Sequence, residues 1–365
     1  MSESKPESSP SSLAERPRQS LTPELAQSDF LKACRKEKTS RTPVWLMRQA
    51  GRYMKEFREI RSKVGFLELC KNPELCCEVT VHAQQTIDAD AAIIFADILL
   101  PLDAFGVGLS YVKGEGPQIE RPFRNENDLA ALPDLHAAEA LSYVIEAIRQ
   151  TRQALKPNIP LLGFAACPFT LASYLIEGGS SRNFENTKTL MYSRPELWSG
   201  LMDKIVPFSI DYLNAQIDAG AQALQVFDSW VGCLSPLDYK QYVLPHTKRM
   251  ISGIAAGTPV IHFGTGTGNL LGLMKEAGGD VIGLDWRVEL AETWRSLGDV
   301  AVQGNLDPCV LFGERDFIEK SCLNILRAAR GRNGHIFNLG HGVLPSTSVD
   351  NVKVLIDFVH RFDEN

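Results

Sequence analysis

Ala91-Ala-Ile-Ile-Phe-Ala-Asp97 is a run of six apolar residues that ends in an acid. The run has the length of a β-strand and shows no alternation of apolar and polar residues. A strand of this kind is typical of a parallel sheet that helices cover on both faces. Asp97 would then stand at the carboxyl end of its strand.

Similar runs recur along the chain, and the segments between them have helical periodicity. Residues 141–149, for example, place their apolar side chains on one stripe of a helix. Eight strands that alternate with helices predict an α/β protein, which we interpret as a (β/α)8 TIM barrel. A doubly wound sheet would give a similar pattern and stays open as the alternative. The predicted strands are residues 44–47, 91–96, 161–165, 223–227, 260–263, 281–284, 300–303 and 336–339.

The composition excludes several classes of protein. A formal net charge of -6 argues against nucleic acid as the main partner, because proteins that bind nucleic acid usually carry a basic excess. No apolar run approaches the ~20 residues that a membrane-spanning helix needs. Eight cysteines without a C-x-x-C pair are typical of reduced thiols, so we expect a cytoplasmic protein.

Residues 1–27 differ from the rest of the chain. They are rich in Ser, Pro and Glu and poor in large apolar residues, which predicts a disordered tail. An organelle transit peptide is the alternative, but Glu3, Glu7 and Glu15 argue against it because such peptides are poor in acids. Residues 28–365 have an even composition without a linker, so we expect one domain there.

The densest group of candidate site residues follows the first predicted strand. Arg48 and Arg52 flank the small turn Gln49-Ala50-Gly51. Guanidinium groups bind carboxylates through two parallel hydrogen bonds, and the first amides of the following helix also favour anions. The segment therefore predicts a site for carboxylate groups. Arg58 is interleaved with glutamates and is more typical of a solvated helix face.

Other polar residues end predicted strands or stand in loops that follow them. In a barrel these ends converge on the face where active sites are built. Asp97 could therefore be a functional acid, or it could cap a turn. Taken alone, Tyr174 could be a core tyrosine and Ser229 a helix cap. His341 lies between two glycines and could be a loop hydrogen-bonding group.

Gly264-Thr-Gly-Thr-Gly-Asn269 imitates a dinucleotide-binding loop. It follows a predicted strand, and Asp285 comes about 20 residues later, as the dinucleotide pattern requires. The third glycine of that pattern is replaced by Asn269, and in the next frame by Leu271. A tight loop is therefore the better interpretation, and we expect no dinucleotide cofactor.

Two segments resemble signatures of the uroporphyrinogen decarboxylase family. They are Pro43-Val-Trp-Leu-Met-Arg-Gln-Ala-Gly-Arg-Tyr-Met54 and Gly163-Phe-Ala-Ala-Cys-Pro-Phe-Thr-Leu-Ala-Ser-Tyr-Leu-Ile-Glu-Gly178. Shorter segments at residues 94–99, 225–229, 283–287 and 338–342 resemble the family in the same order. The resemblance covers residues 28–362. It departs from the family at Ala166-Cys167, where a Gly-Ala-Pro-like turn is expected, and in the additional tail.

The resemblance implies a TIM-barrel enzyme that needs no cofactor and no metal. Its substrate would be the porphyrinogen uroporphyrinogen III, whose four acetate groups lose carbon dioxide to give coproporphyrinogen III. By resemblance Asp97 receives the pyrrole N–H groups, while Arg48, Arg52 and Arg61 bind carboxylates. The implied catalytic residues are Asp97, Arg48, Tyr174 and His341. The implied substrate-binding residues are Arg48, Gln49, Ala50, Gly51, Arg52, Arg61, Asp97, Tyr174, Ser229 and His341.

Two other functions stay open at this point. Related barrel methyltransferases bind zinc through a His-x-Cys pair, but the matching strand reads His262-Phe-Gly264 and lacks the thiol. A tetrapyrrole carrier without activity would use the same fold. The resemblance also implies a homodimer. The proton donor stays open between Arg48, Tyr174 and a bound water.

Overall fold

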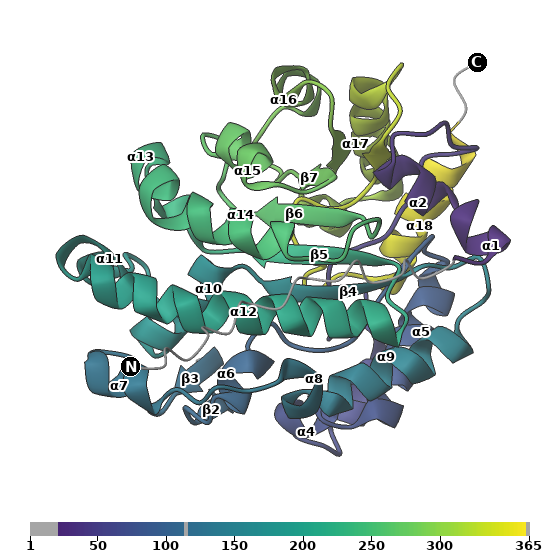
Figure 1. The fold of residues 1–365 in the computed structure, drawn as a ribbon. Helices are drawn as coiled ribbons and strands as arrows, with labels where there is room; N and C mark the ends of the chain where they lie inside the picture. Colours follow the sequence, from purple (N-terminus) through teal and green to yellow (C-terminus); the bar gives the residue numbers. More distant parts are fainter. Residues whose placement is uncertain (1–20, 113–115, 363–365) are drawn as a thin grey trace, which may run out of the picture.

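The computed structural model describes residues 21–112 and 116–362 (Figure 1). A seven-stranded parallel sheet occupies its centre, with the strand order β1-β4-β5-β6-β7-β8-β9. A separate antiparallel hairpin consists of β2 (Leu109–Val112) and β3 (Gly116–Ile119). The strands of the central sheet are β1 (Ala92–Ile93), β4 (Leu161–Ala166), β5 (Ala223–Asp228), β6 (Val260–Gly264), β7 (Val281–Gly283), β8 (Ala301–Gln303) and β9 (His335–Ile336).

The first predicted strand, residues 44–47, is reduced to an isolated parallel bridge between Val44 and Phe337. The backbone N–H of Phe337 donates to the carbonyl of Pro43 at 2.9 Å, beyond the end of β9. On the other side, the N–H of Asp90 donates to the carbonyl of Val44 at 2.8 Å, just before β1. This segment therefore joins the two edges of the sheet. The α/β barrel is confirmed, because a doubly wound sheet would leave those edges apart.

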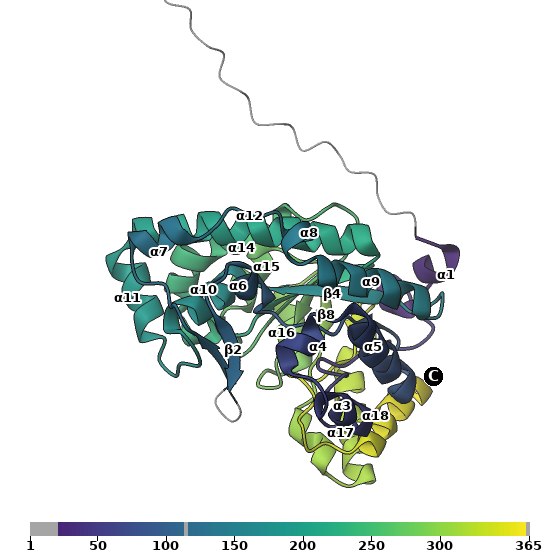
Figure 2. The same cartoon turned by 90° about the horizontal axis from the view of Figure 1, so that it is seen from below.

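The helices surround the barrel (Figures 1 and 2). Local sequence explains several of their ends. Asn72 caps α5 by accepting from the N–H of Leu75 at 2.9 Å, and α10 ends at Gly178 with a φ of 83°. The α-helices are α1 (Pro23–Ala26), α2 (Asp29–Cys34), α3 (Lys55–Arg61), α4 (Phe66–Cys70), α5 (Pro73–Ile87), α6 (Leu100–Ala104), α7 (Glu126–Ala131), α8 (Ala137–Ala140), α9 (Ser142–Ala154), α10 (Pro168–Glu177), α11 (Glu185–Ser193), α12 (Pro195–Ala219), α13 (Pro236–Asp238), α14 (Leu244–Ser252), α15 (Leu271–Ala277), α16 (Leu290–Leu297), α17 (Arg315–Ala329) and α18 (Val349–Arg361). Shorter helical turns are η1 (Val231–Cys233), η2 (Tyr239–Val243) and η3 (Pro308–Phe312).

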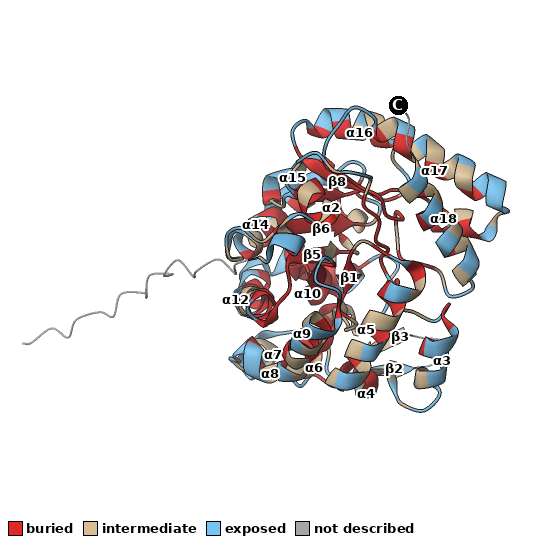
Figure 3. Cartoon of the chain, turned by 90° about the vertical axis from the view of Figure 1, so that its right-hand side faces the viewer, coloured by how far each residue is buried: buried red, intermediate tan, exposed pale blue. Residues whose placement is uncertain are grey.

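Buried residues gather on the strands and on the inner sides of the helices (Figure 3). They form two apolar clusters. The smaller one joins Val44 and Leu46 to residues of α3, α5, α17 and α18. The larger one contains most of the sheet together with the helices that follow β1 to β7. Phe95, directly after β1, packs against both clusters, so the two meet where the first strand ends.

The last residues of the predicted disordered tail, residues 1–27, include a helix. Residues 1–20 of that tail lie outside the described residues. Residues 23–26 are helical in α1, where Thr22 accepts from the N–H of Leu25 at 3.4 Å and Pro23 fills the first turn. Leu25 is only 6% exposed. A Thr-Pro pair is a helix-start signal, and the sequence-based boundary overlooked it.

Candidate active site

A cavity of about 1010 Å³ lies where the strands have their carboxyl ends. Its lining comes from segments that are far apart in the sequence, including residues 47–52, 93–99, 227–229 and 341–345. The barrel brings these segments together because every parallel strand ends on the same side. The volume is at the upper end of the usual range for small-molecule sites, so a large ligand would fit.

The cavity unites nearly all of the predicted site residues, which are contributed by the first turn, α3, the segments after β1 and β5, α10 and the last loop. The predicted residues that line it are Arg48, Ala50, Gly51, Arg52, Arg61, Asp97, Tyr174, Ser229 and His341. Large apolar side chains complete the wall, namely Phe57, Phe66, Phe95, Phe164, Phe227 and Phe263. The site therefore combines arginines and one carboxylate with broad aromatic surfaces.

Gln49 is the exception, because it is 1% exposed and does not line the cavity. Its side-chain oxygen accepts from the N–H of Leu46 at 3.2 Å, and its amide nitrogen donates to the carbonyl of Ala91 at 3.1 Å. Its own carbonyl accepts from the hydroxyl of Tyr53 at 2.7 Å. The polar groups of Gln49 thus hold the turn against the segment before β1, and its predicted contact with substrate stays a prediction.

The turn places Arg48 in an unusual backbone conformation. Its φ is +60°, which few residues other than glycine adopt. The N–H of Val343 donates to the carbonyl of Met47 at 2.9 Å, so the last loop is attached to the turn. A Cβ on Gly342 would come within 2.4 Å of the Arg48 side chain. The glycine after His341 therefore leaves the space through which the Arg48 side chain passes.

Asp97 is a half-buried acid with few compensating partners. Burial raises its pKa, and this rise is opposed by the N–H of Leu99, by the Tyr111 hydroxyl and by the charge of Arg48. The Leu99 N–H donates to Oδ1 of Asp97 at 2.8 Å. Burial in turn lowers the pKa of Arg48, against the charge of Asp97, which favours the cation. Arg48 is exposed and Asp97 is half-buried, so the cavity wall presents both signs of charge to a ligand.

His341 and Tyr174 are uncharged side chains that can form hydrogen bonds with a ligand. Burial lowers the pKa of His341 to about 4, with the charges of Arg48 and Arg287 adding to the effect. Burial raises the pKa of Tyr174 to about 12, and the edge of its ring packs on Trp230 at 4.9 Å between centroids. At neutral pH the imidazole is uncharged and the phenol keeps its proton. Both side chains can orient a polar ligand without adding charge.

Sequence reasoning missed Tyr111, which lies on β2 and lines the cavity. The segment Leu-Ser-Tyr-Val at residues 109–112 is a short β-rich run and could have been assigned as a strand. It follows no barrel strand, however, so the rule that points to strand ends did not select it.

Among the described residues, one group could hold a metal ion. Cys167, Asp228 and His262 bring potential ligand atoms within 4.8 Å of one another, and all three residues are buried. None of them lines the cavity. An ion there would not contact a ligand in the cavity.

The sequence model of uroporphyrinogen decarboxylase matches residues 25–362. The curated uroporphyrinogen decarboxylase of Carboxydothermus hydrogenoformans is 53% identical over 334 residues, which cover 91% of this chain and 95% of the relative. The relative of the same name from Roseiflexus sp. is 49% identical over 345 residues, covering 93% of this chain and 99% of the relative.

Solved structures resemble the chain at lower identity. A methyltransferase from Methanosarcina mazei has a TM-score of 0.78 at 20% identity and covers 92% of this chain and 98% of its own. A B12-independent methionine synthase from Shewanella sp. has a TM-score of 0.52 at 9% identity, covering 79% of this chain and 87% of its own. These likenesses concern the fold alone. No helix on the described residues has the length and apolar character to cross a membrane.

Proposed function

The chain belongs to the uroporphyrinogen decarboxylase family, and from this we propose that it converts uroporphyrinogen III to coproporphyrinogen III. The reaction removes carbon dioxide from four acetate side chains and leaves methyl groups. The observation that carries the proposal is the cavity itself, in which arginines and the half-buried carboxylate of Asp97 lie among aromatic walls.

The chemistry of the substrate accounts for this combination of residues. A porphyrinogen has a broad apolar ring system, a rim of carboxylates and N–H groups that point to its centre. Arg48, Arg52 and Arg61 provide cations for the rim, because guanidinium groups pair with carboxylates. Asp97 is the one acidic residue that the described part of the chain contributes to the cavity lining, and it provides an acceptor for the N–H groups.

The difficult step is the departure of carbon dioxide, which leaves an electron pair on carbon. Protonation of a pyrrole ring carbon first creates a cation next to the acetate. The bond between the acetate CH2 and its carboxylate then breaks, and the electron pair neutralises the ring. The exocyclic carbon gains a proton to become methyl, and the ring carbon loses its proton. Each carbon dioxide is thus replaced by one proton, and the ring itself accepts the electrons.

The role of Asp97 is to stabilise that cation. A fixed negative charge near the pyrrole nitrogens stabilises the intermediate more than the neutral substrate, which is the condition for catalysis. Arg48 holds a carboxylate, while Tyr174, Ser229 and His341 orient the substrate by hydrogen bonds. For proton donation, Tyr174 retains an acidic hydrogen at neutral pH, whereas a guanidinium is a very poor acid. A bound water is the other candidate.

We extend the proposal to a homodimer in the cytoplasm. The resemblance to the family supports the dimer, and the eight cysteines, all free, suit a reducing compartment. Sedimentation of the purified protein tests the first part. A monomer at micromolar concentration would contradict it.

Anaerobic incubation with uroporphyrinogen III tests the activity. Chromatography of the oxidised products should show the stepwise loss of four carboxylates without added metal or cofactor. Binding without loss of carbon dioxide would instead support a tetrapyrrole carrier. Transfer of a methyl group to a thiol, restored by zinc after chelation, would support the methyltransferase alternative.

A further inference from the structure

Tyr111 stands in the cavity wall beside Asp97. It lies on β2, where it pairs with Pro117 of β3. Its ring packs edge-on against Phe66 with 4.6 Å between centroids, and Phe66 in turn contacts the ring of Phe95 at 6.2 Å. These contacts hold the phenol in one orientation, so its hydroxyl has a fixed place in the wall.

The hydroxyl of Tyr111 is buried and makes no hydrogen bond of normal geometry with the described residues, but it lies close enough to Asp97 to lower the pKa of that carboxyl. A buried donor without a partner is costly, so it needs an explanation. Burial raises the pKa of Tyr111, and the charge and hydrogen-bonding capacity of Asp97 add to the rise. Asp97 receives one backbone hydrogen bond, from Leu99, at Oδ1. A small movement of either side chain would therefore satisfy both groups.

We propose that Tyr111 is a positioning residue that donates a hydrogen bond to Asp97 and keeps this carboxylate ionised when substrate fills the cavity. This inference rests on the proposed function. A ring that enters the cavity displaces water from Asp97 and disfavours its charged form. A second donor offsets that effect, because hydrogen bonds to the ionised form favour it.

Other titratable groups around Asp97 do not replace this donor. Arg48 is a cation, but in the proposed complex its guanidinium group pairs with a substrate carboxylate. Cys70 on α4 and Tyr212 on α12 are influenced by Asp97, yet burial raises the pKa of each and keeps it neutral. Tyr174 on α10 faces Asp97 and is also neutral, but it is assigned to the substrate. Among these groups, Tyr111 is the one whose hydroxyl has no other assigned partner and is free to donate to Asp97.

The test is the variant Tyr111→Phe, which removes one oxygen and keeps the ring contacts. The acidic limb of the pH profile of turnover should move to higher pH by about one unit, the scale of one hydrogen bond to a charged group. Turnover should return to the wild-type value at alkaline pH, where Asp97 is ionised in both proteins. A merely structural loss would lower turnover at every pH.

Tyr143→Phe is the matched control, because the Tyr143 hydroxyl is also buried without a partner but lies outside the cavity lining. Its profile should match that of the wild type. An infrared titration without substrate gives an independent measurement, with the protonated carboxyl band of Asp97 assigned by its loss in Asp97→Asn. Tyr111→Phe should raise the midpoint of this band.

An unshifted profile and an unshifted band would overturn the role of Tyr111 while leaving the proposed function intact. If the wild-type protein released no carbon dioxide but the band still shifted, the proposed function would fail and the contact with Asp97 would stand.

Discussion

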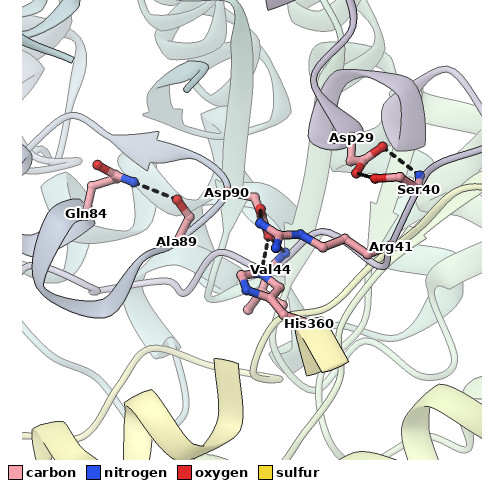
Figure 4. A network of polar contacts seen from close by, with 8 residues as sticks. All are labelled: Asp29, Ser40, Arg41, Val44, Gln84, Ala89, Asp90 and His360. Atoms are coloured by element: carbon pink, nitrogen blue, oxygen red, sulfur yellow. Dashed lines mark hydrogen bonds and ion pairs between the residues drawn. The ribbon is translucent and has the colours of Figure 1, made fainter. Parts of the chain in front are cut away.

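Asp90 and Asp97 flank β1 (Ala92–Ile93), Asp90 before its amino end and Asp97 after its carboxyl end, and show how differently one fold treats two carboxylates. Asp90, at the amino end, accepts from Arg41 at 2.7 Å, from the N–H of Val44 at 2.7 Å and lies 2.7 Å from Nε2 of His360 (Figure 4). Asp97, at the carboxyl end, receives the N–H of Leu99. The first carboxylate ties three segments together, and the second keeps its capacity to bind a ligand.

The pKa shifts of Asp90 and Asp97 follow from these partners. Burial alone would raise the pKa of Asp90, but the hydrogen bond and charge of His360, then Val44 and Arg41, leave it lowered. Burial raises the pKa of Asp97 because its partners compensate less. In barrel enzymes the carboxyl ends of the strands carry catalysis and the amino ends carry stability. The two aspartates therefore separate these tasks along one strand.

The largest expected effect is on turnover. Asp97→Asn keeps the shape of the side chain but removes the charge that stabilises the cation, so turnover should fall by roughly two to three orders of magnitude. Asp90→Asn, the matched change at the other end of the strand, should leave turnover of the folded protein close to wild type. Steady-state assays of both variants measure this, and similar losses in both would contradict the division of tasks.

Stability should respond in the opposite sense. Asp90→Asn loses two ionic partners and should lower the free energy of unfolding by about 1–2 kcal/mol. Asp97→Asn removes a half-buried charge whose pKa is raised in the fold, so its Tm at neutral pH should stay equal to or exceed that of the wild type. Thermal unfolding monitored by circular dichroism compares them, and a lower Tm for Asp97→Asn would mean that this carboxylate also holds the fold.

The pH dependence sharpens this contrast. The pKa of Asp90 is lowered in the fold, so its stabilising contribution is complete above the unfolded pKa and is lost as pH falls through the folded value. The pKa of Asp97 is raised, so its destabilising effect is relieved as pH falls through the folded value. The deficit of Asp90→Asn should therefore shrink in acid, and an unchanged deficit at low pH would contradict the ionic role of Asp90.

The residues that line the cavity, at the carboxyl ends of the strands, were easier to predict from the sequence than the contacts at the amino ends. Apolar runs that end in Asp97 or Ser229 are local signals, and the barrel rule places such strand ends together. Asp90 has partners that lie 49 and 270 positions away, at Arg41 and His360, so no local pattern connects them. The place of Gln49 outside the cavity lining was not predicted for a related reason, since only the fold shows that its amide donates to the Ala91 carbonyl.

A smaller effect is expected at the turn before α3. Arg48→Lys keeps the charge but loses the planar fork that grips a carboxylate, so kcat/KM should fall by about tenfold. Kinetics with uroporphyrinogen III give the value. Wild-type kinetics would show that Arg48 acts only as a point charge.

The smallest effect concerns the first residues. Removal of residues 1–20 should leave Tm and turnover nearly unchanged, because this segment lacks the apolar residues that docking requires. Removal of residues 1–27 should cost more, since Leu25 is buried against the barrel. Equal and large losses in both truncations would show that the first 20 residues also contribute to the folded protein.

The most direct test of the account compares turnover with product binding in Asp97→Asn. Coproporphyrinogen III offers the same N–H groups as the substrate but develops no cation, so its affinity depends little on the charge of Asp97. Measured anaerobically on one preparation, turnover should fall by roughly two to three orders of magnitude while the Kd for product rises less than about tenfold. Turnover near the wild-type value in a normally folded variant would contradict the assignment of Asp97 and the mechanism built on it.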